Sequence, residues 1–315
     1  MLKFILKRVL LSVPIFIGIT VIVFVLSNMA PGSPLDIMDA SGTLTKQAYE
    51  ELQVSLGLDK PIIVRYLIWL FDLSRGDFGV SSNTSYQVLQ LIGQRIGPSL
   101  LLTGNSILLS IMIGIPLGVA AAYKPYSIWD NLSSVISFIG VSTPNFFVSL
   151  VLIYIFAVKL NLLPAQGMYF NNTQTLSGLV LHLILPSIVL SIQMLGSFVK
   201  QTKGSVLEVL NDDYIKTARA KGLSEIKVVV RHALRNALIP IVTTIGMMVP
   251  VLIGGAVITE QIFSWPGIGS LMVLSVNTRD YNTIMGITVI VAVTVIITNI
   301  ILDVIYTFLD PRIRL

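Results

Sequence analysis

Long runs of residues without a charged side chain alternate with shorter charged segments along the whole chain. The first run, residues 9–29, contains twenty-one uncharged residues, and about 20 are needed to cross the hydrocarbon core of a bilayer as a helix. Five later runs pass the same test. The expected spans lie near 9–29, 99–122, 132–157, 179–199, 238–258 and 283–304. The pattern predicts an all-α membrane protein with six transmembrane helices.

The first run predicts a membrane anchor rather than a cleaved signal peptide. Lys3, Lys7 and Arg8 form a basic start, and the apolar run behind them is longer than the hydrophobic region of a signal peptide. The polar, turn-forming stretch NNTQTLSG (171–178) separates the third expected span from the fourth.

Basic residues indicate the orientation. With both termini in the cytoplasm, the inner segments hold fourteen of the twenty-one Lys and Arg residues. The outer segments hold seven, and five of these lie in the long segment 30–98, to which the positive-inside rule scarcely applies. The sequence therefore predicts a multi-pass protein of the cytoplasmic (inner) membrane with both termini cytoplasmic.

The chain divides into three parts on this pattern. Residues 1–29 hold the cytoplasmic N-terminus and the first transmembrane helix. Segment 30–98 is expected to be a folded extracytoplasmic elaboration, with a helical stretch at 45–58 and an apolar stretch at 62–71. Residues 99–315 form the core domain of five transmembrane helices, and this domain includes a charged cytoplasmic loop at 201–236.

Composition supports the membrane class and removes several kinds of site. The 315-residue chain is 54% hydrophobic and 12% charged, and its mean hydropathy is +0.84, far above that of an ordinary soluble domain. It has no cysteine, so disulfides, zinc-thiolate sites and thiol catalysis are excluded. The two histidines, His182 and His232, are fifty positions apart. The net charge is +5, and the basic residues lie at the ends of apolar runs. This distribution indicates membrane topology rather than nucleic-acid binding.

Several expected spans contain glycine and proline. Small residues allow close helix packing, and this interpretation is favoured. Flexible or broken helices around a pathway are the functional alternative. The residues are Gly114, Pro116, Gly118, Gly140, Pro144, Gly246, Pro250, Gly254 and Gly255.

Segment 201–235 differs from the rest because it carries eleven charges. Placing each charge at bilayer depth costs about 2.5–3.5 kcal/mol, so the sum of about 30 kcal/mol excludes a span. Two short helices with a sharp turn are expected. Asp212 and Ser224 stand at N-cap positions, and Gly222 stands where a left-handed residue closes the first helix.

The second of these helices is expected to carry Lys227, Arg231 and Arg235 on one face, at four-residue spacing. Two interpretations remain open for the whole segment. It is either a basic amphipathic loop on anionic lipid headgroups or a short helix docked in the groove of a partner, which the small residues Ala218, Ala220 and Gly222 would permit.

Four stretches resemble one protein family in the right order. ARAKGLSEIKVVVRHALRNALIP (218–240) is similar to the cytoplasmic loop of inner-membrane permeases of ABC importers, in the dipeptide, oligopeptide and nickel branch. The N-terminal KRVLLSVPIFIGITVIVFVL followed by APG resembles the family's first span. LGLDKPIIVRYLIWL with RGDFG resembles its outer segment, and EQIFSWPGIGSLMVLSVNTRDY (260–281) resembles its connection between the fifth and sixth spans.

The resemblance implies the type I ABC importer permease fold and a non-catalytic translocation subunit. Its implied partners are a second similar permease, two ATP-binding subunits and an extracytoplasmic solute-binding protein; the cargo would be a peptide, or nickel or a metal chelate. No cofactor is expected on this chain, because ATP and Mg would bind the partner subunits. The residues implied to couple to the ATPase are Asp213, Tyr214, Thr217, Ala218, Arg219, Ala220, Lys221 and Gly222.

Three other functions would each require a motif or a residue pattern of their own: ATP binding, ion-coupled transport and intramembrane hydrolysis. The chain has no GxxxxGK[ST] phosphate loop. An ion-coupled secondary transporter would place ionisable residues near the bilayer midplane, and the six span centres have none. An intramembrane hydrolase needs a base beside its nucleophile, and His182 is a lone histidine that is expected at the membrane interface.

Five polar residues lie within the expected spans. Such residues either line a pathway or form hydrogen bonds from helix to helix. They are Asn105, Ser142, Asn145, Gln193 and Thr243.

Overall fold

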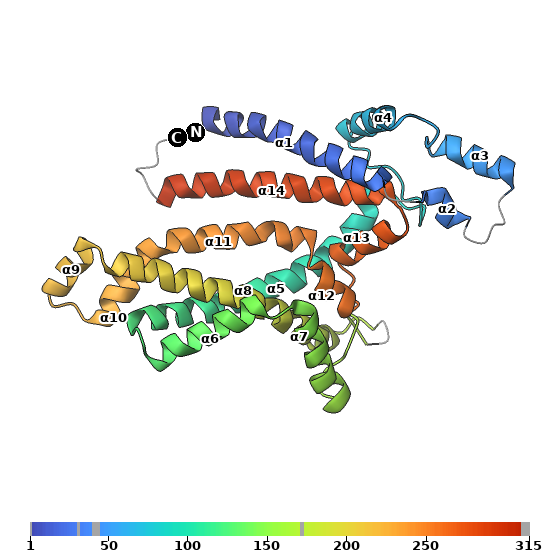
Figure 1. The fold of residues 1–315 in the computed structure, drawn as a ribbon. Helices are drawn as coiled ribbons and strands as arrows, with labels where there is room; N and C mark the ends of the chain where they lie inside the picture. Colours follow the sequence, from blue (N-terminus) through green and yellow to red (C-terminus); the bar gives the residue numbers. More distant parts are fainter. Residues whose placement is uncertain (1, 30–31, 40–44, 171–172, 310–315) are drawn as a thin grey trace.

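The structure is a computed structural model and describes residues 2–29, 32–39, 45–170 and 173–309. Within these ranges the chain is helical, and extended pairing is limited to two isolated bridges, Val80 with Gln87 and Phe170 with Thr173. The long helices run roughly side by side (Figure 1). The prediction of an all-α fold is confirmed.

Four of the expected spans are helices long and apolar enough to cross a membrane unaided. They are α1 (Leu2–Met29), α5 (Val88–Tyr123), α8 (Leu176–Leu210) and α14 (Tyr281–Leu309). The fifth expected span is α11 (Leu234–Gly254), whose continuous described apolar part, Pro240–Val251, is shorter than a full span. The third expected span has a different form.

The third expected span, 132–157, is not one straight helix. It consists of α6 (Ile128–Ser142) and of α7 (Asn145–Leu152) continued by the π-helix η1 (Ile153–Lys159), and the two halves are bent by 103°. The break lies at Thr143, whose backbone is extended, and Pro144. Proline has no N–H for the helical ladder and disfavours the α conformation in the residue before it. At Pro144 the span is therefore broken, as one of the two interpretations of the glycines and prolines predicted.

Close packing explains the glycines elsewhere. A Cβ on Gly118 of α5 would lie 2.7 Å from Cβ of Thr202 on α8, and one on Gly140 of α6 would lie 2.5 Å from the carbonyl oxygen of Ile192. These distances are far below van der Waals contact, so the backbones of α5 and α6 approach α8 as closely as glycine allows.

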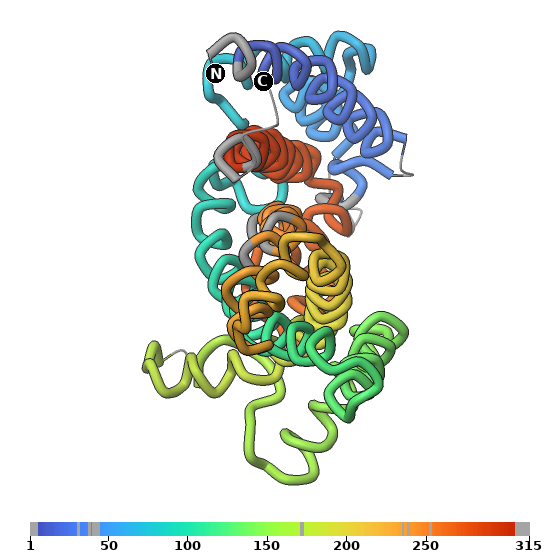
Figure 2. Tube along the Cα trace, turned by 90° about the vertical axis from the view of Figure 1, so that its left-hand side faces the viewer, coloured from blue at the N-terminus to red at the C-terminus, as the bar shows by residue number. Residues whose placement is uncertain are grey.

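The helices form a stack when the molecule is viewed from one end (Figure 2). Helix α14 lies between α1 and α11, and α8 packs on α5, α6 and α11. The first helix is joined to α14 by an ion pair, in which Nε of Arg8 lies 3.1 Å from Oδ2 of Asp303.

Short helices occupy both ends of the stack. At one end lie α2 (Pro34–Met38), α3 (Lys46–Ser55), α4 (Ile62–Ser74), α12 (Val257–Ile262) and α13 (Ile268–Asn277); at the other lie α9 (Asp213–Ala220) and α10 (Glu225–Lys227), which the π-helix η2 (Val228–Ala233) joins to α11 (Figure 1).

Two helices extend about ten residues beyond the expected spans. Residues 88–98, expected in the segment before the second span, are the first turns of α5, and residues 201–210, expected in the charged loop, are the last turns of α8. In both cases the helix continues beyond the apolar run because helical hydrogen bonds are formed in water as well as in hydrocarbon. Hydropathy marks the membrane-embedded part and not the end of the helix.

Candidate functional site

The charged stretch forms a helical turn at one end of the stack (Figure 1). Helix α9 begins after Asp212, whose backbone is extended as an N-cap residue should be, and its carbonyl accepts from the N–H of Ile215 at 3.1 Å. The Asp212 side chain makes no capping bond, and neither does Ser224 at the start of α10. Both cap positions are confirmed, but the stabilising side-chain bonds expected of them are not formed.

One face of α9 is buried. Ile215 is fully buried and Ala218, one turn later, is 7% exposed. They belong to a cluster with residues from the ends of three long helices and from η2: Ala122 on α5, Val206 on α8, Val228, Val229 and Ala233 on η2, and Ala237 on α11. Helix α9 therefore packs mainly on η2 and belongs to one cluster with residues of α5, α8 and α11.

The opposite face of α9 is exposed. It includes most residues implied to couple, namely Asp213, Tyr214, Thr217, Arg219 and Ala220, with Lys221 and Gly222 after the helix. Ala218 instead lies on the buried face of α9, and its predicted role in coupling would act through packing under the helix. Ile215 was not among the predicted residues, although its three-residue spacing from Ala218 places the two on one helical face.

The turn after α9 has the conformation expected of glycine. Gly222 has φ +73° and donates its N–H to the carbonyl of Arg219 at 2.9 Å. An ion pair closes the turn, because Nε of Arg219 lies 2.8 Å from Oε1 of Glu225 and its second nitrogen donates to Oε2 at 3.3 Å. A two-point contact fixes the relative orientation of α9 and α10.

The second expected helix is not separate from the fifth span. Helix α10, η2 and α11 follow one another without a break, so the stretch continues into the bilayer-crossing part. Lys227 and Arg231 are exposed, as predicted; the side chain of Arg235 lies outside the described part. Asn236 donates to the hydroxyl of Tyr214 at 2.6 Å, which links α9 directly to α11.

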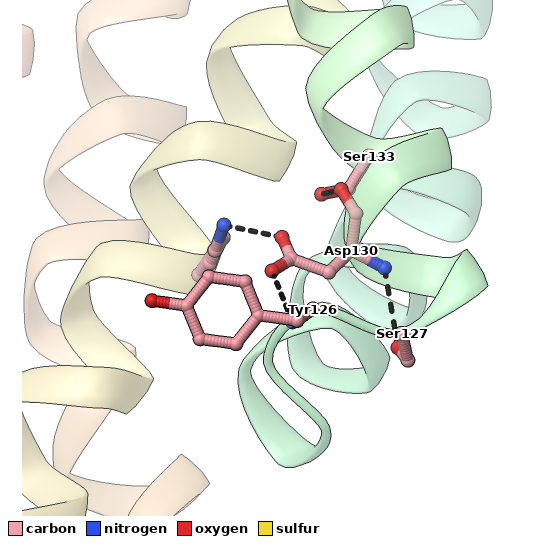
Figure 3. Close-up of polar contacts among 5 residues, drawn as sticks. Tyr126, Ser127, Asp130 and Ser133 are labelled. Atoms are coloured by element: carbon pink, nitrogen blue, oxygen red, sulfur yellow. Dashed lines mark hydrogen bonds and ion pairs between the residues drawn. The ribbon is translucent and has the colours of Figure 1, made fainter.

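A second link joins the same ends of α6 and α8. Asp130, in the first turn of α6, pairs with the ammonium of Lys203 near the end of α8 and accepts from the N–H of Tyr126 at 2.9 Å (Figure 3). Tyr126 itself has φ +62° and is 94% exposed. Sequence reasoning missed this pair, since its members are 73 positions apart.

The polar residues within spans do not form one cluster. Asn105 donates to Ser187 at 2.9 Å, a bond between α5 and α8, which favours the helix-to-helix interpretation for Asn105. Asn145 donates to Gln193 at 2.7 Å, and Ser142 is exposed three residues earlier, beside the break. Thr243 lies on α11. The structure thus brings together Asn145 and Gln193 near the bend of the third span.

At the other end, Glu260 on α12 is a buried carboxylate that ties three segments together. Its Oε1 accepts from the hydroxyl of Ser99 on α5 at 2.8 Å, and its Oε2 accepts from the N–H of Ser270 on α13 at 2.9 Å. Ser99 in turn accepts from the N–H of Ile268. Burial raises the pKa of Glu260, and these hydrogen bonds oppose the rise. Trp265 adds a bond from Nε1 to the carbonyl of Pro98 at 2.9 Å.

Asp280 makes a similar connection before α14. It accepts from the hydroxyls of Ser81 at 2.5 Å and Thr283 at 2.7 Å, so the turn after α4 is fixed to the start of the last span. The stretch 260–281 is therefore a rigid connection that holds the starts of α5 and α14.

The surroundings of His182 bear on the alternative of an intramembrane hydrolase. His182 is buried, its Nδ1 lies 2.7 Å from the carbonyl oxygen of Gly178, and its ring meets Phe170 edge-on; this is a structural role within one turn of α8. Phe170 covers the ring, and the expected position of His182 at the membrane interface stays a prediction. Among the described residues no group of His, Asp and Glu side chains could hold a metal ion.

Comparison with known proteins identifies relatives along the whole chain. Residues 114–315 match the family model "Binding-protein-dependent transport system inner membrane component", and residues 1–100 match the corresponding N-terminal model. The chain is 43% identical to the oligopeptide transport system permease protein AppB of Bacillus subtilis over all of both chains. It is 38% identical to the dipeptide transport system permease protein DppB of Escherichia coli K12, over 100% of this chain and 99% of the relative.

A solved structure shares the fold. A chain of the methionine ABC transporter MetNI, in an inward-facing conformation, superposes with a TM-score of 0.53 at 17% identity and covers 70% of this chain and 97% of its own length. At this identity the likeness concerns the fold alone.

Proposed function

Because the chain belongs to the family of binding-protein-dependent transport system inner membrane components, we propose that it is the non-catalytic transmembrane subunit of an ATP-driven importer of small peptides. It is a multi-pass inner-membrane protein. The names of its full-length relatives, which are oligopeptide and dipeptide permeases, support a peptide cargo over nickel or a metal chelate. Its proposed partners are a second permease, two ATP-binding subunits and an extracytoplasmic solute-binding protein.

The observation that carries the mechanism is the position of α9. Its buried residues share one packed cluster with residues of α5, α8, η2 and α11, and Tyr214 is bonded to Asn236. A force on the exposed face, which includes Asp213, Thr217 and Arg219, would reach three spans through one packed cluster. Closure of the ATP-binding subunits would then move these helices together, and the Asp130–Lys203 pair would carry α6 with α8.

The division of the chain follows from this mechanism. The core of five spans, 99–315, would change conformation, α1 would stay attached to it through α14, and segment 30–98 would form the extracytoplasmic part. The connection at 260–281 would hold the starts of α5 and α14 as a fixed outer frame. Asn145 and Gln193 also bond helix to helix, but Gln193 is exposed and the pair lies beside the bend of the third span, so we propose them as candidates for lining the path.

The division of labour with the ATPase has a direct test. The purified chain should neither bind nor hydrolyse ATP, because its sequence lacks a phosphate loop. Co-expression with its ATP-binding subunits should give a complex whose hydrolysis is stimulated by peptide-loaded binding protein. Equilibrium binding of a labelled ATP analogue and phosphate release are the measurements. Saturable ATP binding to this chain alone would contradict the assignment.

The orientation can be tested in sealed cells because the chain has no native cysteine. With both termini and α9 in the cytoplasm, Asn83→Cys should react with an impermeant maleimide added outside, whereas Ser224→Cys should react only after permeabilisation. Both side chains are exposed, so neither result depends on burial. Labelling of position 224 in intact cells would reverse the orientation.

A further inference from the structure

Helix α4 presents an apolar face that nothing in the described chain covers. Its sequence, IIVRYLIWLFDLS, places Ile63, Leu67 and Phe71 at four-residue spacing, with Val64 and Ile68 beside them. All five side chains are exposed; Ile63 is 71% and Leu67 57% exposed. A water-facing helix would carry charges on this side.

The polar residues of α4 point the other way, toward the protein. Arg65 lies over the ring of Tyr281 at 5.9 Å. Arg65, Asp72 and Tyr281 help to line a cavity of about 320 Å³. Arg65 and Asp72 thus face the cavity, together with Ile68 and Trp69, whereas Ile63, Val64, Leu67 and Phe71 are exposed on the outer side of the helix.

The contacts of α4 fix its depth. The hydroxyl of Tyr66 lies 3.0 Å from Oγ1 of Thr20, and the Tyr66 and Trp69 rings pack on Phe24. Thr20 and Phe24 belong to the first span, which ends at Met29. At 1.5 Å per residue, Phe24 lies about 8 Å and Thr20 about 14 Å below the end of α1. Helix α4 thus lies beside the half of α1 that is farthest from α9 (Figure 1).

From these observations we propose that α4 is an interfacial helix embedded in the leaflet on its side of the membrane, the outer leaflet in the orientation given above. Its apolar face contacts acyl chains. Ile22 and Leu26 of α1 are also exposed, on the side of α1 away from Thr20 and Phe24. Arg75 lies over the ring of Phe71 at 4.1 Å, where a long basic side chain can reach the headgroups from an apolar surface.

The outer segment is then only partly a water-facing elaboration. Its apolar helix would hold the cavity beside Arg65 at the level of the headgroups, where a soluble binding protein meets the membrane. The inference depends on membrane insertion and not on the nature of the cargo, so it can fail while the proposed peptide transport stands.

Depth measurements on nitroxide labels test the proposal. Leu67→Cys would be labelled in the assembled transporter, with any partner cysteine replaced, in phospholipid nanodiscs. Leu26→Cys on α1 is the lipid-facing control and Asn83→Cys the water-facing control. The label at position 67 should collide with oxygen and be shielded from a water-soluble nickel chelate, as at position 26. The label at position 83 should show the reverse preference.

Two outcomes would overturn the proposal. A label at position 67 that is as accessible to the chelate as the one at 83 would place α4 in water. A label shielded from both chelate and oxygen would mean that a partner protein covers the face. Retained ATP hydrolysis in each labelled complex shows that the variants are folded and assembled.

Discussion

Gly222→Val is expected to abolish peptide uptake while the chain stays folded and inserted. Gly222 has φ +73°, and a branched side chain in this region costs about 1–2 kcal/mol or more. Apart from the chain neighbours, no atom of the described residues lies within 4 Å of the Cβ position, so an added Cβ meets no clash there. Its effects are limited to straining the turn clamped by Arg219 and Glu225 and to obstructing a partner docked there.

Gly76→Val is the matched control. Gly76 is also exposed, has φ +81° and has open space around its Cβ position, but it lies in the turn after α4. Uptake of a labelled dipeptide, surface expression and retention of the ATP-binding subunits during purification are the measurements. Gly222→Val should lose uptake and retention, whereas Gly76→Val should keep retention. Equal losses in both would assign the effect to backbone strain alone.

The competing interpretation, a loop on lipid headgroups, predicts the opposite ranking. In that case the basic residues would matter most, and the pair Lys227→Ser and Arg231→Ser should reduce activity more than Gly222→Val. Both side chains are exposed, so their removal leaves the packed cluster under α9 intact. Normal uptake with full retention in Gly222→Val would support the lipid-surface loop.

The sequence predicts those features that depend on local chemistry. Gly222 is recognisable because helices commonly end with a residue in the left-handed conformation, which is usually glycine. The four long apolar helices are recognisable because about the same length is needed to cross the hydrocarbon in each case. The face of α9 was only half predicted: the pattern shows a short charged helix, but Ala218 and Ile215 are assigned to the core only by the helices beneath them.

Contacts between distant segments were beyond sequence reasoning. Asp130 and Lys203 are both polar residues near span ends, and nothing in their spacing marks them as a pair. The bend of the third span was signalled by Pro144, yet proline within a span is often tolerated: Pro186 lies inside α8, which continues through it. Whether a proline bends or breaks a helix depends on which neighbours satisfy the freed backbone groups.

Glu260 illustrates the same limit, because only the fold brings it within reach of Ser99, 161 positions away. Its side chain is fully buried, and glycines surround the carboxylate: a Cβ on Gly267 would lie 2.4 Å from it. The hydroxyl of Ser99 and the N–H of Ser270 both donate to this group. With the carboxylate removed, buried donors lose their partner, and each unsatisfied group costs about 1–3 kcal/mol.

Glu260→Ala is therefore expected to destabilise the chain by about 2–5 kcal/mol, with a lower thermal midpoint of the assembled complex and less complex in the membrane. Glu260→Gln should be intermediate, because its oxygen can still accept from Ser99 but its NH₂ group meets the N–H of Ser270. Glu50→Ala is the control, since Glu50 is exposed and its 4.0 Å pair with Lys46 contributes little. Thermal unfolding followed by size-exclusion chromatography ranks the three variants. If Glu260→Ala unfolds at the same temperature as Glu50→Ala, the carboxylate does not hold α5, α12 and α13 together.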